Sequence, residues 1–129
     1  PAPASKQLYR SQEARTLLNV VRTGMRDVVS GSSGTARRVF TARAPDLKSR
    51  AAGKTGTADR GASKRLGRNA RNSTFAGWLD DRAGKPAFAF GCSVSLTGRR
   101  SGGAVSVPPV CAYAVAELMK RIDARVLAK

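Results

Sequence analysis

Residues 51–58 read Ala-Ala-Gly-Lys-Thr-Gly-Thr-Ala and hold the side chains best suited to bind a small anion. Lys54 supplies a fixed positive charge, and the hydroxyls of Thr55 and Thr57 supply rotatable donors and acceptors. Gly56 lets a ligand come close to the main chain. On an edge strand, this set would bind a carboxylate or an oxyanion.

The Gly-Lys-Thr order also invites comparison with a phosphate-binding P-loop. That motif needs a glycine five residues before Gly53, and position 48 is Lys48. The P-loop interpretation therefore fails, and an ordinary exposed strand-end lysine is the remaining structural alternative.

The Lys-Thr-Gly segment resembles the third signature of serine β-lactamases and penicillin-binding proteins. Residues 51–58 are similar to the form found in high-molecular-weight penicillin-binding proteins. Four flanking landmarks occur in the family's order, at residues 24–29, 34–36, 73–78 and 102–108. Class B, division-type transpeptidases are the most similar, and the resemblance covers residues 11–127.

The resemblance implies roles for matching positions. Lys54 would lie beside the proton network of the catalytic serine. Thr55, Gly56 and Thr57 would bind the carboxylate of a D-Ala-D-Ala stem peptide or a β-lactam, and the backbone N–H of Thr57 would be an oxyanion donor. Peptidoglycan stem peptide or β-lactam is thus the expected ligand, with no metal and no cofactor.

One departure from the family is decisive. The family requires a Ser-x-x-Lys and a Ser-x-Asn, and no serine of this chain has a lysine three residues on or an asparagine two residues on. Since both motifs precede Lys-Thr-Gly, residues 11–129 resemble the C-terminal half of a transpeptidase domain, and residues 1–10 a linker or cut end. The missing N-terminal part is an expected partner. Without it the chain should not form an acyl-enzyme.

The composition limits the kinds of partner and compartment that suit the chain. The formal net charge is +16, histidine is absent, and there are two cysteines among 129 residues. Such a charge implies an anionic partner or surroundings, which could be nucleic acid, acidic lipid headgroups or an acidic polymer. The sequence has no membrane-span or signal-peptide pattern. The resemblance implies a periplasmic or cell-surface location, with anchoring to the inner membrane by a segment outside this chain. Cys92 and Cys111 are interpreted as buried thiols or as one bridge in an oxidising compartment.

Two alternative functions remain. One is a basic module that binds nucleic acid or acidic polymer, although the few aromatics have core-like spacing and no basic recognition helix is evident. The cations of residues 59–72, with Arg99 and Arg100, are interpreted as solvated loop charges. The other alternative is a penicillin-binding-like scaffold without catalysis. No specific nucleic-acid partner is expected.

The expected fold is α+β, with a three-stranded antiparallel sheet that is part of a larger sheet and has amphipathic helices against one face. A first helix begins at Ser11, and a short second helix, residues 36–40, is capped by Thr35. Strands are expected at 51–58, 73–79 and 86–96, separated by a loop at 59–72 and a tight turn at 80–85.

Helical spacing predicts the core faces of the first and last helices. The first comprises Leu17, Leu18, Val20, Val21, Met25, Val28 and Val29, and the last comprises Cys111, Val115, Leu118, Met119, Ile122 and Val126.

Overall fold

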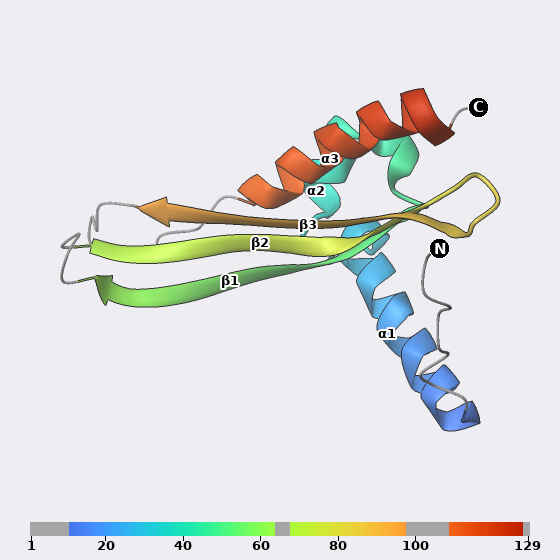
Figure 1. Ribbon diagram of the computed structural model, residues 1–129, viewed down its shortest axis with the longest axis horizontal. Coiled ribbons are helices and arrows are strands. Elements are labelled where there is room, and N and C mark those ends of the chain that lie inside the picture. Colours follow the sequence, from blue (N-terminus) through green and yellow to red (C-terminus); the bar gives the residue numbers. More distant parts are fainter. Residues whose placement is uncertain (1–10, 64–67, 98–108, 128–129) are drawn as a thin grey trace, which may run out of the picture.

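The computed structural model describes residues 11–63, 68–97 and 109–127, and within them the chain has the expected α+β fold (Figure 1). Its elements run in this order: α1 Gln12–Ser30, α2 Arg37–Arg43, a 3₁₀ turn Pro45–Leu47, β1 Ala51–Ser63, β2 Arg68–Asp80, β3 Pro86–Thr97, α3 Val110–Ile122, and a wider helical turn Asp123–Leu127. None of the described helices is both long and apolar enough to cross a bilayer.

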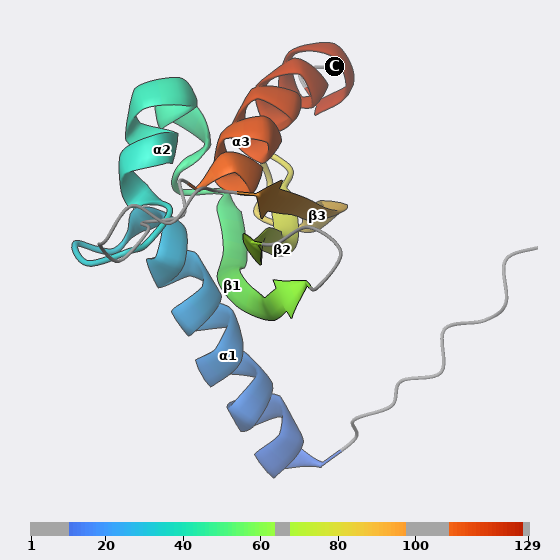
Figure 2. The same cartoon turned by 90° about the vertical axis from the view of Figure 1, so that its left-hand side faces the viewer.

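The three strands form one antiparallel sheet in the order β1-β2-β3. The register sets Thr55 opposite Phe75 and Phe75 opposite Cys92, and α2 and α3 cover this face (Figure 2). Helix α1 packs along β1, and its N-terminal half projects away on the other side (Figure 2). The prediction that helices cover a single face is therefore wrong for α1.

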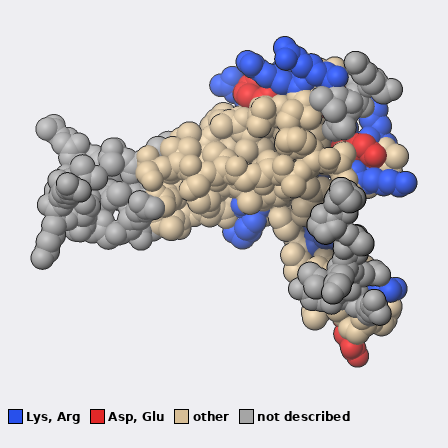
Figure 3. Space-filling view, viewed as in Figure 1, with Lys and Arg blue, Asp and Glu red and all other residues tan. Residues whose placement is uncertain are grey.

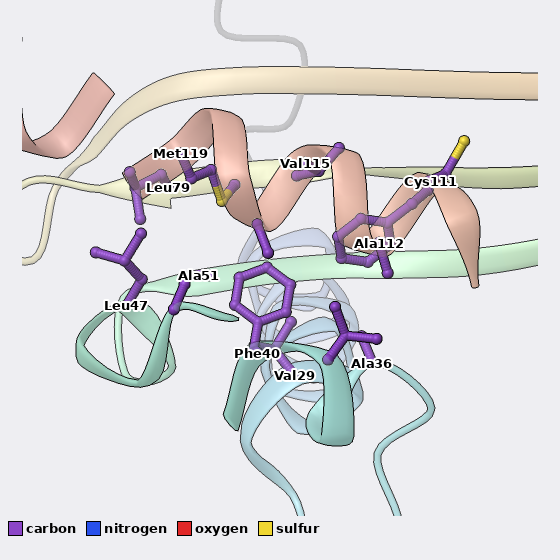
Figure 4. Close-up of a cluster of buried hydrophobic side chains, with 14 residues drawn as sticks. Val29, Ala36, Phe40, Leu47, Ala51, Leu79, Cys111, Ala112, Val115 and Met119 are labelled. Carbon is purple, nitrogen blue, oxygen red and sulfur yellow. The ribbon is translucent and has the colours of Figure 1, made fainter. Parts of the chain in front are cut away.

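The hydrophobic core lies between the sheet and the pair α2 and α3 (Figure 4). Phe75 lies at its centre, with ring centroids 6.1 Å from Phe40 and 5.0 Å from Phe90. The buried apolar members are Val29, Ala36, Val39, Phe40, Ala44, Leu47, Ala51, Phe75, Leu79, Cys111, Ala112, Val115, Ala116 and Met119.

Helix α1 begins as predicted, because the Ser11 hydroxyl accepts a hydrogen bond from Ala14 N at 3.1 Å. Its predicted apolar face is wrong in part. Val29 is fully buried, whereas Leu17, Val20 and Val21 are 67%, 65% and 57% exposed. The cause is geometric, since the N-terminal part of α1 projects away from the sheet and the other helices (Figure 2).

Helix α2 runs to Arg43 and has no side-chain cap at its start. The Thr35 capping prediction is wrong, because the Thr35 hydroxyl instead contacts the Thr55 hydroxyl at 2.7 Å. Pro45 ends this helical segment as predicted and opens the short 3₁₀ turn, where its missing N–H costs nothing.

The loop predicted at residues 59–72 is largely strand. Pairing continues beyond Ala58 opposite Asn72 to Ser63 opposite Arg68, with a bulge between Asp59 and Ala62. Main-chain pairing does not require apolar alternation, so a polar hairpin extension leaves little trace in hydrophobic periodicity. The turn after β2 is as predicted, with Asp81 N donating to Lys85 O at 2.8 Å and Gly84 at φ 77°.

The buried face of helix α3 differs from the predicted face at one leucine and two alanines. Leu118 is 49% exposed rather than buried, while Ala112 and Ala116 are fully buried. The two alanines let α3 approach α2 and the sheet closely, which turns Leu118 outward. The predicted loop charges Arg99 and Arg100, the landmark at 102–108 and the side chain of Val126 lie outside the described residues.

A disulfide joins Cys92 of β3 to Cys111 of α3, with the two Cα atoms 5.5 Å apart. The alternative of two free thiols is therefore wrong. The bridge pins the start of α3 to the third strand, which stabilises the helix against the core face of the sheet.

Asp80, at the end of β2, is a buried carboxylate with several partners. It accepts from Arg26 Nη2 at 2.5 Å and from Trp78 Nε1 at 3.0 Å. Asp80 N donates to the main-chain oxygen of Arg50, and Arg50 Nη1 donates to the main-chain oxygen of Asp80. The second terminal nitrogen of this guanidinium, Nη2, donates to Asp123 Oδ1 at 2.6 Å. We call Arg26, Arg50, Trp78, Asp80 and Asp123 the Asp80 clamp, because they connect α1, β1, β2 and the end of α3.

Cationic side chains gather over the end of α3 (Figure 3). Lys120, Arg121 and Arg125 are exposed there. These side chains contribute part of the chain's net charge of +16.

Replacing Asp80 with asparagine should lower the free energy of unfolding by about 2 to 3 kcal/mol. The substitution leaves the Arg26 charge without its partner and turns an amide donor toward it. Urea denaturation measures the change. Asp46→Asn, at an exposed carboxylate, is the control and should stay within about 0.5 kcal/mol; equal effects of both substitutions would contradict the clamp.

Removing the disulfide by a Cys92→Ala, Cys111→Ala double substitution should cost about 3 kcal/mol. The bridge closes a loop across a sequence separation of 19 residues, which restricts the unfolded chain. Denaturation with and without reductant checks the value, and the double variant should be indifferent to reductant. Two titratable thiols in the native, unreduced protein would contradict the bridge.

Candidate functional site

Strand β1 carries the four predicted site residues on its two faces. Thr55 and Thr57 lie opposite Phe75 and Ser73, on the face that the core helices cover, and Lys54 and Gly56 lie on the other face. The side chains of Lys54 and Thr57 are exposed, and Thr55 is half-buried. The stretch is thus accessible to a ligand at its far end, beyond the core.

The register also decides which way the main chain of β1 points. Asp80 N donates to Arg50 O at 2.9 Å, which is one of the two bonds of a hydrogen-bonded pair, while Arg50 N donates to Leu47 O. Such pairs alternate along an antiparallel ladder, and residues between them direct N–H and C=O away from the partner strand. Thr55 and Thr57 fall at the in-between positions. Their N–H groups therefore point to the edge of β1 opposite β2, where no strand is paired in the described residues.

Two short contacts organise the start of this edge. Lys54 Nζ donates to Thr55 O at 2.6 Å. The Thr35 and Thr55 hydroxyls lie 2.7 Å apart, with either able to donate. A hydroxyl has one proton and two lone pairs, so Thr55 keeps capacity for two more hydrogen bonds after this contact.

Close packing beneath the strand explains its glycines. A Cβ at Gly53 would lie 2.7 Å from Phe75 Cε2 and 2.9 Å from Ala76 O. A Cβ at Gly56 would overlap the Thr74 hydroxyl. Gly53 is therefore needed by the neighbouring strand, whereas a side chain at Gly56 would require the Thr74 hydroxyl to rotate away.

An open groove of about 550 Å³ lies between the end of α1 and β1. Lys54 and Thr35 lie on one side of it, and α1 supplies the other. Its lining is Gly24, Asp27, Val28, Gly31, Ser32, Ser33, Gly34, Thr35 and Lys54. Lys54 brings the groove next to the predicted carboxylate-binding stretch.

Chemically, this arrangement can hold an anion. A lysine, two hydroxyls and outward N–H groups suit a carboxylate and an oxyanion. In the described ranges there is no cluster of three or more His, Cys, Asp or Glu that could bind a metal ion.

Sequence reasoning missed two residues next to the site. Thr35 was expected to cap a helix, and Thr74 was not assigned a role. A signal for Thr35 existed, since the Gly-Thr of residues 34–36 is one of the quoted landmarks. Thr74 also lies in a quoted landmark, residues 73–78, but only the register shows that it faces Gly56.

Comparison with known proteins gives one match. The sequence model of a family described as penicillin binding protein transpeptidase domain matches residues 6–120. No curated protein and no solved structure matches the chain.

The contact between Gly53 and Phe75 predicts that Gly53→Ala will lower the free energy of unfolding by about 2 kcal/mol, because an added methyl must displace a ring of the core. Gly91→Ala is the matched control. A Cβ at Gly91, also in a strand, would meet nothing within 4 Å, and its alanine variant should be neutral or slightly stabilising. Thermal or urea denaturation compares the two, and a neutral Gly53→Ala would contradict the packing described.

Proposed function

The chain belongs to the penicillin binding protein transpeptidase domain family, and on that premise we propose that it supplies one wall of a D,D-transpeptidase active site. The observation that carries the proposal is the edge geometry of β1. Lys-Thr-Gly-Thr lies on an edge strand, and the register turns the Thr57 N–H outward. A peptide carboxylate and a reacting carbonyl could both lie along that edge.

In the proposed reaction, a serine hydroxyl from the rest of the domain attacks the penultimate D-alanine carbonyl. The oxyanion formed accepts a hydrogen bond from Thr57 N–H, an interaction worth about 3 kcal/mol in comparable sites. The terminal D-alanine leaves as its amine takes a proton, and an amine of a second stem peptide then displaces the serine. A β-lactam would stop after the first attack, since its leaving amine stays attached.

The side chains of the stretch take three roles in this scheme. Thr55 and Thr57 hydroxyls bind the terminal carboxylate, and Lys54 adds positive potential and adjoins the serine's proton network. Gly56 keeps the edge free of a side chain. The exposure of Lys54 and Thr57 supports these assignments.

We further propose that residues 11–129 are the C-terminal half of a class B, division-type domain. The absent Ser-x-x-Lys and Ser-x-Asn motifs support this division of the active site. The partner is then the N-terminal part of the domain, which carries the serine and its base.

An extracytoplasmic location fits the family and two properties of the chain. The Cys92–Cys111 disulfide suits an oxidising compartment. The net charge of +16 suits the anionic polymer and lipid surfaces of a cell envelope. Anchoring to the inner membrane would come from a segment outside this chain.

The test is covalent labelling by a fluorescent penicillin of the domain assembled from this chain and a polypeptide that carries Ser-x-x-Lys and Ser-x-Asn. Thr57→Val should slow labelling about 10- to 100-fold, because it removes one charge-assisted hydrogen bond to the carboxylate. Ser93→Val, at another exposed strand hydroxyl, should leave the rate unchanged. Absence of labelling in a well-folded assembly, or indifference to Thr57→Val, would refute the proposed site.

A further inference from the structure

The groove between the end of α1 and β1 has two walls of opposite charge. Its α1 wall consists of Gly24, Asp27, Val28 and Gly31, which recur at helical spacing and therefore share one face of the helix. Lys54 lies on the other wall. The volume of about 550 Å³ falls in the range of small-molecule sites, and the proposed function assigns no role to the acidic wall.

Asp27 stands where a carboxylate is unfavourable. Because α1 ends at Ser30, Asp27 lies in its last turn, beside the negative end of the helix dipole, and that turn has no basic residue. The chain has 24 lysine and arginine residues, yet none of those in the described ranges forms an ion pair with Asp27. An exposed, unpaired carboxylate in so basic a chain is explained if it binds a cation from outside.

The two walls together select the class of ligand. Lys54 and the Thr35 hydroxyl, which contacts the Thr55 hydroxyl at 2.7 Å, suit a carboxylate. Asp27 and the negative end of α1 suit an ammonium group. A ligand that carries both groups, such as the end of an amino acid, therefore matches both walls. A metal ion is a poorer occupant, because the described residues hold no cluster of three or more His, Cys, Asp or Glu.

From these observations we infer that the groove binds the acyl acceptor of the transpeptidation, a stem-peptide amino acid that presents a primary amine and a carboxylate. The inference rests on the proposed function. Asp27 attracts the acceptor as its ammonium form, and its carboxylate lies beside Lys54 and Thr35, where the departed D-alanine has left room.

The transfer step then follows from this placement. The bound ammonium gives one proton to water, and the neutral nitrogen attacks the carbonyl of the acyl-serine ester. The new C–N bond forms as the bond from the carbonyl carbon to the serine oxygen breaks. The second proton of the amine passes to that serine oxygen, which restores the hydroxyl. Asp27 contributes binding to this step, because it holds the acceptor next to the site before the attack.

The first test needs only this chain. D-alanine, which carries both charged groups, is titrated into the isotopically labelled chain, and the amide shifts of Gly24, Gly31 and Gly34 in the groove lining are followed by NMR. The native chain should show saturable shifts at these glycines. Asp27→Asn should raise the half-saturating concentration about 5- to 10-fold, because it removes a charge-assisted interaction at an exposed site. D-alaninamide, which lacks the carboxylate, should also bind the native chain more weakly than D-alanine does.

Asp46→Asn is the matched control. Asp46 is an exposed carboxylate outside the groove lining, so its variant should bind D-alanine within about twofold of the native chain. The melting temperature of Asp27→Asn should equal that of the native chain or exceed it, because the substitution removes a charge that the helix dipole disfavours. Weaker binding by Asp27→Asn then reports the groove rather than the fold.

The second test uses the assembled domain with a depsipeptide donor that ends in D-lactate. The acyl-enzyme partitions between hydrolysis and transfer to D-alanine, and mass spectrometry measures the ratio of the amide product to the acid product. Both products arise from the same acyl-enzyme, so this ratio does not depend on the rate of acylation. Asp27→Asn should lower the ratio about 5- to 10-fold at subsaturating D-alanine, and Asp46→Asn should leave it within about twofold.

The outcomes separate this inference from the proposed function. Saturable shifts in the groove that Asp27→Asn weakens, without penicillin labelling of any assembled domain, would support the amino acid site and refute the catalytic proposal. Intact labelling of the assembled domain, with no shifts in the groove or with a product ratio indifferent to Asp27→Asn, would overturn the acceptor site and leave the proposed active site standing. Equal effects of Asp27→Asn and Asp46→Asn would also overturn it.

Discussion

The buried carboxylate of Asp80 must be matched by charge and hydrogen bonds, because an unpaired charge beside the core costs several kcal/mol. Arg26 and Trp78 supply that match, while Arg50 holds the adjoining main chain and reaches on to Asp123. The consequence is mechanical as well as energetic. Helix α1 cannot leave the start of β1 without exposing the carboxylate, and the segment after α1 is thereby kept close to Thr55.

This clamp connects the core to the candidate site. The α1 helix leads into the segment that carries Thr35, whose hydroxyl contacts Thr55 at 2.7 Å. From the other side, Phe75 closes over Gly53 and fixes how β1 lies on β2. The edge of β1 is thus held before any ligand arrives, as electrostatic catalysis requires. Under the proposed function, this preformed wall acts only when a nucleophile is brought to it.

Much of this structure could be predicted from the sequence wherever a residue acts on the backbone next to it. Ser11, Pro45 and Gly84 act through the backbone next to them, so the helix start, the break and the hairpin turn were predictable. Predictions failed where the structure depends on contacts between residues that are distant in the sequence. The Thr35 hydroxyl contacts Thr55 rather than capping its own helix. Cys92 and Cys111 are brought together only by the packing of α3 on β3. The polar extension of the strand beyond Ala58 depends on pairing with β2. The apolar spacing of Leu17, Val20 and Val21 predicted burial and was wrong, because nothing in the described residues covers these side chains. For the site, the Lys-Thr-Gly motif located β1, whereas the outward direction of the Thr57 N–H required the register.

The central claim is that the edge of β1 receives the reacting carbonyl, and a crystal structure of the penicillin-acylated, assembled domain tests it most directly. The account predicts the carbonyl oxygen of the acyl group about 2.7–3.1 Å from Thr57 N, with the adduct's carboxylate at the Thr55 and Thr57 hydroxyls. An acyl group attached to the serine but lying away from β1, with Thr57 N unoccupied by the adduct, would contradict it.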